Sequence, residues 1–230
     1  MSSIHVLSLR LLVLGATGGV GRELVEQALL RGHRVTALVR SPEKLEPTSL
    51  RLTVVLGNPL DSDTIANLLP GHDAVLSALG PSGLGRTTVV SEGARSTILA
   101  MEETGVQRLL IVSVAMLFRD AGLVAAALRN TFLRNVAADA AEMERLVRTS
   151  SLDFTIVRPP RLTYGPLSGR VAAADDHLPK GAGGTSTASR ADVANFMLEE
   201  LVSNEHVRRV VGVAAQKRKV LPMHEAPISI

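Results

Sequence analysis

A run of apolar residues that ends in a glycine-rich turn constrains the fold of this chain more than any other feature. Residues 11–14 form the run, the turn reads Gly15-Ala16-Thr17-Gly18-Gly19-Val20-Gly21, and a helix-like segment, 22–31, follows at once. Gly15 permits a tight turn, Gly18 lets a ligand approach the backbone, and Gly21 lets the helix pack closely on the strand. Free N–H groups at the start of the helix attract phosphate oxygens. The spacing predicts the first unit of a dinucleotide-binding domain; the alternative is a glycine turn that only shapes the fold.

Strand-like and helix-like segments alternate along the rest of the chain, with no internal repeat. The residue patterns predict strands over 34–39, 52–56, 73–79, 108–114, 154–157 and 207–213, and helices that begin at 61–63 or span 87–104, 136–150 and 189–203. This alternation is typical of an α/β fold with a doubly wound parallel sheet, the Rossmann fold. Two segments fit the pattern less well: 115–134 is predicted to be a lid or a loose helix, and 161–187 to be mainly loop.

The composition favours one domain with an aliphatic core. Hydrophobic residues make up 46% of the 230 residues, but aromatic residues only 2%, which suits buried parallel strands. We predict a single domain over 1–230, with an N-terminal extension at 1–9 and a flexible tail at 214–230. No apolar run approaches the roughly 18 residues that span a bilayer, and the first residues lack the pattern of a secretory signal. We therefore expect a soluble, cytoplasmic protein with no membrane partner.

Several classes of site are disfavoured. The chain has no cysteine, which removes disulfides and thiolate chemistry, and its histidines (His33, His72, His177 and His224 among them) lack the paired spacing of a metal site. The formal charge is only +3, and aromatic rings on which bases stack are scarce. Nucleic acid is therefore not expected as a partner, although the basic segment 217–219 leaves the role of the tail open.

The residue that follows the second predicted strand indicates which nicotinamide cofactor is bound. Proteins that bind NAD commonly place Asp or Glu there, on the ribose 2′-hydroxyl. This chain has Arg40, and its next acidic residue is Glu43. A guanidinium can bind a 2′-phosphate through two hydrogen bonds, whereas a carboxylate would repel it. Arg40 therefore favours NADP; the alternative is a surface arginine with no ligand.

Ligands of such sheets bind at the carboxyl ends of the strands. The fourth predicted strand ends at Ala78-Leu79-Gly80, which should pass beside the cofactor diphosphate and ribose. The fifth ends near Ser113, whose hydroxyl is a candidate for contact with the nicotinamide or the substrate. The alternative for Ser113 is a hydroxyl that only caps the turn.

The chain resembles the atypical short-chain dehydrogenase/reductase group of NAD(P)-binding, NmrA-like proteins. Within that group it resembles most closely the flavin reductase (biliverdin reductase B) branch. The resemblance runs over about 11–213. It rests on the glycine turn, Leu38-Val39-Arg40, Thr87-Thr88-Val89-Val90-Ser91-Glu92-Gly93-Ala94-Arg95, Arg158-Pro159-Pro160, Gly165-Pro166-Leu167-Ser168-Gly169 and Phe196-Met197-Leu198.

The resemblance implies an NADPH-dependent reductase whose planar substrate stacks on the nicotinamide. It implies contacts of Gly15, Thr17, Gly18, Gly19, Val20 and Gly21 with the diphosphate, of Arg40 with the 2′-phosphate, and of Ser113, Pro159 and Pro160 with the nicotinamide. Arg161 and Tyr164 would border the substrate. The sequence departs from the pattern in three places: Arg161 and Ala140 replace histidines, and Asn58, followed by Pro59, replaces the acidic residue near the adenine.

The chemistry available is narrower than in most short-chain dehydrogenases, which use a tyrosine and a lysine four residues later. The one tyrosine, Tyr164, lies after the double proline, and none of the lysines Lys44, Lys180, Lys217 and Lys219 falls in the helix after Ser113. Hydride transfer to a conjugated acceptor such as a flavin, quinone or tetrapyrrole does not need that pair, because the acceptor delocalises the charge and solvent can supply the proton. The sequence thus predicts an NADPH-dependent reductase of such acceptors. The alternatives are a regulator that senses NADP without turnover, and a reductase or isomerase of an unrelated small molecule.

Overall fold

The structure is a computed structural model that describes residues 8–46, 49–81, 83, 85–131, 133–183 and 185–216. The strands are β1 (Arg10–Leu14), β2 (Arg34–Val39), β3 (Leu52–Leu56), β4 (Ala74–Ser77), β5 (Arg108–Val112), β6 (Asp153–Arg158), β7 (Arg161–Thr163), β8 (Val171–Asp175), β9 (Thr187–Ser189) and β10 (Arg209–Ala215). The α-helices are α1 (Gly19–Leu30), α2 (Ser62–Leu68), α3 (Val89–Thr104), α4 (Gly122–Asn130), α5 (Arg134–Thr149) and α6 (Arg190–Ser203), with short 3₁₀ turns at Pro42–Lys44, Ala115–Leu117 and Arg119–Ala121.

The predicted Rossmann architecture is confirmed. Eight strands form one sheet in the order β3-β2-β1-β4-β5-β6-β10-β8, and only the last pairing, of β8 with β10, is antiparallel. The order reverses between β1 and β4, and at such a point the connections leave the sheet in opposite directions and open a crevice at the carboxyl ends of the strands. The topology alone therefore predicts a ligand site at the carboxyl ends of β1 and β4.

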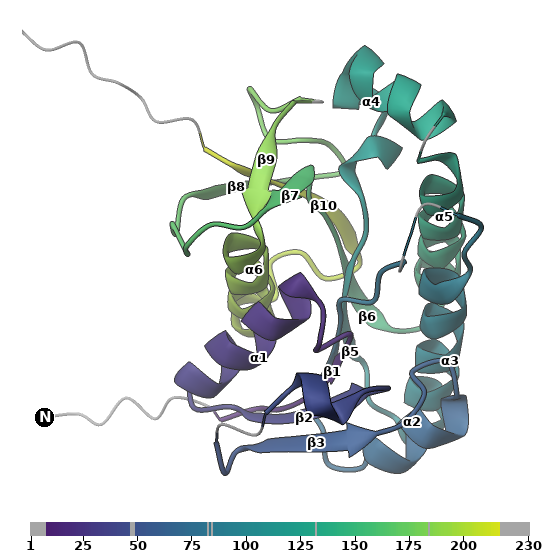
Figure 1. The fold of residues 1–230 in the computed structure, drawn as a ribbon, viewed down its shortest axis with the longest axis vertical. Coiled ribbons are helices and arrows are strands. Elements are labelled where there is room, and N and C mark those ends of the chain that lie inside the picture. Colours follow the sequence, from purple (N-terminus) through teal and green to yellow (C-terminus); the bar gives the residue numbers. More distant parts are fainter. Residues whose placement is uncertain are drawn as a thin grey trace, which may run out of the picture.

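Helices cover both faces of the sheet, as Figure 1 shows: α1 and α6 lie together on one face, and α2, α3 and α5 on the other. The apolar residues of β1 alternate between these faces. Leu11 and Val13 belong to the cluster under α1 and α6, whereas Leu12 and Leu14 belong to the cluster under the other helices. β1 is thus buried on both sides, which explains why its sequence reads as an uninterrupted apolar run.

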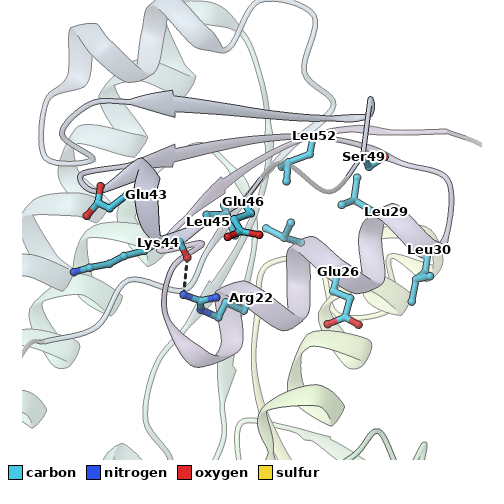
Figure 2. Close-up of a pocket in the computed structure, with 11 residues that line it drawn as sticks. Arg22, Glu26, Leu29, Leu30, Glu43, Lys44, Leu45, Glu46, Ser49 and Leu52 are labelled. Carbon is cyan, nitrogen blue, oxygen red and sulfur yellow. Dashed lines mark hydrogen bonds between the residues drawn. The ribbon is translucent and has the colours of Figure 1, made fainter.

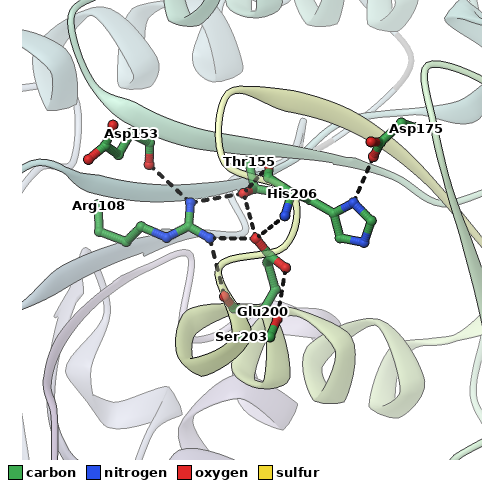
Figure 3. Close-up of polar contacts among 7 residues, drawn as sticks. All are labelled: Arg108, Asp153, Thr155, Asp175, Glu200, Ser203 and His206. Carbon is green, nitrogen blue, oxygen red and sulfur yellow. Dashed lines mark hydrogen bonds and ion pairs between the residues drawn. The ribbon is translucent and has the colours of Figure 1, made fainter.

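Buried polar contacts join α6 to the amino ends of β5 and β6, far from the carboxyl ends (Figure 3). Glu200 of α6 accepts from the Nη2 of Arg108 at 2.8 Å and from the hydroxyl of Thr155 at 3.3 Å. The backbone N–H of His206 donates to the same carboxylate at 2.9 Å, and the His206 ring contacts Asp175 of β8 at 2.7 Å. These contacts fix α6, and with it the residues at the start of that helix.

The segment 161–187 is the main correction to the predicted elements. It was predicted to be mainly loop, but it holds β7, β8 and the first residue of β9. β7 and β9 form a two-stranded parallel sheet, and β8 is an edge strand rich in alanine. Such short strands, paired with partners distant in sequence, lack the alternating apolar pattern by which strands are predicted.

The predicted ends of the domain also shift. Ala214 and Ala215 belong to β10 and not to a tail. At the other end Ser8 donates to the carbonyl of Gly32 at 2.8 Å, and the N–H of Leu9 contacts the ring of His33. The remainder of the predicted extension (1–7) and of the tail (217–230) lies outside the described residues. Within the described part of the chain, no helix is long and apolar enough to cross a membrane.

Candidate nucleotide-binding site

A cleft lies at the carboxyl ends of β1, β2 and β4, where the topology predicts it. Its lining residues are Gly15, Thr17, Gly18, Leu38, Val39, Arg40, Asn58, Pro59, Leu60, Ala78, Leu79, Gly80 and Val89. The predicted contacts to the adenosine half and the diphosphate therefore meet in one place, although they come from four separate stretches of sequence. The remaining residues predicted for the glycine turn are Gly19, Val20 and Gly21, which begin α1.

Backbone packing requires glycine at two positions of the turn. Gly15 has a φ of +78°, and a Cβ there would lie 2.5 Å from the carbonyl oxygen of Ala78. A Cβ on Gly21 would lie 2.0 Å from the carbonyl oxygen of Gly15. Side chains at these positions would push the turn away from β4 and α1 away from the turn. The glycines thus hold the start of α1 close to the strand ends.

The start of α1 presents free backbone donors at the edge of this cleft. The first three residues of a helix have no intrahelical carbonyl for their N–H groups, and here these are Gly19, Val20 and Gly21. The N–H of Gly18 donates to the carbonyl of Gly15 at 2.9 Å, which closes the turn. Because the Val20 side chain is buried in the core, Val20 can offer a ligand only its backbone.

Arg40 is exposed at the end of β2 and has no hydrogen bond or ion pair with any other described residue. Arg22 holds the segment that follows Arg40. Its Nε donates to the carbonyl of Thr17 at 3.2 Å and its Nη2 to the carbonyl of Lys44 at 2.6 Å; Figure 2 shows the second bond. The free guanidinium of Arg40 is therefore carried by a loop that is tied to the glycine turn.

Asn58 closes the adenosine end of the cleft. Its side-chain oxygen accepts from the N–H of Leu60 at 3.1 Å, and its carbonyl accepts from the N–H of Asp61. The amide oxygen predicted to meet the adenine amino group thus already has one partner, and a second lone pair remains for a ligand.

A larger cavity, of about 750 Å³, flanks α1 and is shown in Figure 2. It is lined by Val25, Leu29, Leu30, Leu45 and Leu52 together with Glu26, Glu43, Glu46, Ser49, Lys44 and Arg22. Because it lies beside the flank of the helix and includes none of the glycines of the turn, its size does not make it the nucleotide site. The smaller cleft has the strand ends and the free donors.

Ser113, at the end of β5, takes part in a buried polar cluster that was not predicted. Its hydroxyl donates to the Oε1 of Glu144, in α5, at 2.5 Å. Arg158 of β6 donates to both oxygens of Glu144, at 2.8 Å from Nε and 2.5 Å from Nη2. The Arg158 guanidinium also lies 4.3 Å from the centroid of the Phe118 ring. The hydrogen of the Ser113 hydroxyl is therefore directed at a carboxylate, and only its lone pairs are available to another group.

The residues predicted beside the nicotinamide and the substrate lie next to this cluster in sequence. Pro159 follows β6, and its carbonyl accepts from the N–H of Ala115 at 2.9 Å. Pro160 is half-buried, whereas Arg161 is exposed and forms no ion pair with another described residue. Tyr164 is 88% exposed, but the guanidinium of Arg190 lies 3.9 Å from its ring centroid. The ring is thus paired with a cation from the start of α6.

Sequence reasoning missed two further carboxylates that shape this region. Asp192 accepts from the backbone and hydroxyl of Ser168, from the N–H of Gly169 and from the hydroxyl of Ser189. Burial alone would raise the pKa of Asp192, but these hydrogen bonds hold that pKa below its ordinary value. Asp139 of α5 accepts from the N–H groups of Val90 and Ser91 and so caps α3 from a neighbouring helix.

The segment 115–134 contains α4 and two of the three 3₁₀ turns, Ala115–Leu117 and Arg119–Ala121. Phe118 and Ala121 are buried, and Asp120 accepts from the N–H of Leu178 at 3.2 Å. Whether this segment closes over a ligand stays a prediction. The described residues include no group of His, Asp and Glu that could hold a metal ion.

Comparison with known proteins places this geometry in a family. Residues 15–204 match the model of a family described as NAD(P)H-binding. The Bacillus subtilis (strain 168) protein YwnB, which is uncharacterized, is 28% identical over 202 residues, covering 84% of this chain and 92% of YwnB. The 3-diazoavenalumate denitrifying reductase of a Streptomyces species is 31% identical over 216 residues, covering 81% of this chain and 69% of that enzyme.

Solved structures superpose over almost the whole chain. A Streptococcus pneumoniae TIGR4 protein, provisionally named an NADH-flavin reductase, has a TM-score of 0.76 and 26% identity, covering 91% of this chain and 100% of that chain. A short-chain dehydrogenase/reductase (wide type) of Veillonella parvula DSM 2008, solved in complex with NADP, has a TM-score of 0.74 and 19% identity, covering 90% and 94% of the two chains. At that identity the second likeness shows the fold alone.

Proposed function

The chain belongs to the NAD(P)H-binding family, and on that premise we propose that it is an NADPH-dependent reductase that transfers hydride to a flavin or a similar conjugated acceptor. The observation that carries the proposal is the cleft itself. The glycine turn, the free N–H groups of α1 and the unpaired Arg40 lie along one edge of the sheet. Membership of the family supports a nicotinamide dinucleotide as the ligand.

The residues of the cleft fit NADP. The turn around Gly15 and Gly21 leaves no room for side chains and brings the backbone donors of Gly19 and Val20 to the strand ends, where they suit a diphosphate. Arg40 is charged, exposed and unpaired among the described residues, which suits a 2′-phosphate. Among the described residues that line the cleft there is no carboxylate to bind a free 2′-hydroxyl in its place. We therefore propose NADP rather than NAD as the cofactor.

When bound, the nicotinamide supplies the hydride. The chain's own task is to orient the two rings and exclude competing reactions. We propose that Pro159 and Pro160 form part of the wall against the nicotinamide, and that the lone pairs of Ser113 accept from it or from the acceptor. Arg161, exposed at the start of β7, would attract an anionic acceptor by charge.

The polar groups of this region favour an acceptor that needs no proton from the protein. The hydrogen of the Ser113 hydroxyl is donated to Glu144, and Glu144 is paired with Arg158. Tyr164 stacks on Arg190 at the surface. A flavin or quinone delocalises the arriving charge and takes its proton from solvent. The names of two relatives, a reductase and an NADH-flavin reductase, agree with this choice.

A second function is a sensor that binds NADP without turning it over. The absence of a tyrosine–lysine pair from the sequence favours it. The two functions differ in one measurement, the consumption of NADPH with FMN, riboflavin and a quinone as separate acceptors. The reductase predicts turnover with at least one of them. Tight binding of NADP with no turnover on any acceptor would contradict the reductase and support the sensor.

A further inference from the structure

Arg190 lies against the glycine turn, although it is distant from the turn in sequence. It is the first residue of α6, and its side chain crosses to Gly19, the first residue of α1. A Cβ built on Gly19 would lie 2.4 Å from both the Cδ and the Nε of Arg190. The guanidinium therefore occupies the space that a side chain at residue 19 would fill, directly beside the free N–H groups of α1.

The charge of Arg190 is not neutralised within the described part of the chain. Its Nη1 is buried and has no hydrogen-bond partner there, and the residue forms no ion pair with another described residue. Asp192, two residues further on, is the nearest carboxylate in sequence, but Ser168, Gly169 and Ser189 already donate to both of its oxygens. A buried donor of a charged group costs free energy unless something accepts from it.

The surroundings make an unpaired cation here still less favourable. The start of a helix carries partial positive charge, so cations are disfavoured there and anions favoured. Arg190 lies at the start of α6 and reaches the start of α1, so its guanidinium meets two such ends. An oxyanion bound between them would accept from the guanidinium and from the N–H groups of Gly19 and Val20 together.

The two-stranded sheet of β7 and β9 explains why the guanidinium of Arg190 lies at this position. Thr163, the last residue of β7, pairs with Ser189, the last residue of β9, and the residues that follow the two strands are Tyr164 and Arg190. The parallel register sets their side chains side by side, with the guanidinium 3.9 Å from the Tyr164 ring centroid. The contact restrains the cation by a cation–π interaction and leaves its in-plane donors free.

We propose that Arg190, restrained by Tyr164, completes an oxyanion subsite at the start of α1 that takes the diphosphate of the nicotinamide dinucleotide. The inference rests on the proposed function, since the oxyanion belongs to its cofactor. Arg190 would bind the part that NADP and NAD share, and Arg40 the 2′-phosphate in which they differ. Tyr164 then acts as a positioning residue and not as a contact to the substrate.

Calorimetric titration of the full chain with NADP⁺, NAD⁺ and adenosine 2′-monophosphate tests this division. Arg190→Gln should weaken NADP⁺ and NAD⁺ by the same factor, about ten- to a hundredfold for a lost charge-assisted hydrogen bond, and leave adenosine 2′-monophosphate unchanged because it has no diphosphate. Gly19→Ala, which displaces the guanidinium but keeps its charge, should weaken the same two ligands. Arg34→Gln is the matched control. Arg34 is an exposed arginine at the amino end of β2, whereas the cleft lies at the carboxyl ends of the strands.

Three results would overturn the proposal. In the first, Arg190→Gln binds all three ligands as the wild type does, and Arg190 only packs. In the second, it weakens adenosine 2′-monophosphate equally. In the third, it spares the dinucleotides and weakens FMN relative to riboflavin in the presence of NADP⁺, which would assign the oxyanion to the acceptor. Affinity is measured apart from turnover. If the protein binds NADP⁺ through Arg190 but reduces no acceptor, this inference is supported and the proposed reductase function is contradicted.

Discussion

Glu144 provides the sharpest test of how the site is held together. It is 4% exposed and receives the hydroxyl of Ser113 and two donors of Arg158. In Glu144→Gln the amide oxygen can still meet Ser113 and the Nε of Arg158, but the NH₂ group then faces Nη2, which is also a donor. The lost charge-assisted bond costs about 1.5–3 kcal/mol and the buried donor left unsatisfied about 1–3 kcal/mol. The sum agrees with the roughly 3–5 kcal/mol lost when one partner of a buried ion pair is removed.

We therefore expect Glu144→Gln to lower the free energy of unfolding, measured by urea titration, by about 3–5 kcal/mol, and the melting temperature by roughly 6–20 °C for a chain of this size. The control is Glu142→Gln, two residues away in α5. Glu142 is 41% exposed, and its pair with the exposed Arg145 is of a kind that contributes about 0–1 kcal/mol. Equal losses for the two variants, or a loss below about 1 kcal/mol for Glu144→Gln, would refute the reasoning.

Three further predictions follow from other contacts. Gly21→Ala should weaken binding of NADP⁺ at least tenfold, because its Cβ meets the backbone of Gly15 and moves α1 off the turn; Gly183→Ala, with nothing within 4 Å of its Cβ, should not. Ser113→Ala should leave the pH profile of turnover unchanged, because its hydroxyl hydrogen is donated to Glu144; a shifted profile would show that Ser113 moves a proton. Burial lowers the pKa of His72, so below about pH 6.5 the unfolded chain binds more protons and stability falls. His72→Gln should flatten this loss in urea titrations, and an unchanged slope would contradict it.

The residues of the cleft could be predicted from the sequence, because their positions depend on local pattern and on sheet topology. The turn from Gly15 to Gly21 has a spacing that requires a strand before it and a helix after it. Arg40 and Gly80 follow apolar runs that can be recognised as buried strands. Because parallel strands end at one edge of a sheet, these residues were expected to lie together, and they line one cleft.

The rest of the site depends on contacts between segments that are distant in sequence. Glu144 and Arg158 meet because α5 packs beside the end of β6. Arg158 stands in the double-proline motif, but nothing in that motif names Glu144 as its partner. One signal was present: Glu144 lies on the same face of α5 as Ala140, Met143 and Val147, all of which are buried. A charged residue on a buried face requires a partner. Arg190 gave no such signal, since the β7–β9 pairing that places it was not predicted.

The most direct test of the whole account compares the affinities of NADP⁺ and NAD⁺ for the wild type and for Arg40→Glu. If Arg40 binds the 2′-phosphate, the wild type prefers NADP⁺, and the variant loses about ten- to a hundredfold in affinity for NADP⁺, while its affinity for NAD⁺ changes little. The same proteins assayed without an acceptor give this result independently of turnover. A wild type that binds neither dinucleotide, or a variant that weakens both by the same factor, would contradict the assignment of this cleft to NADP.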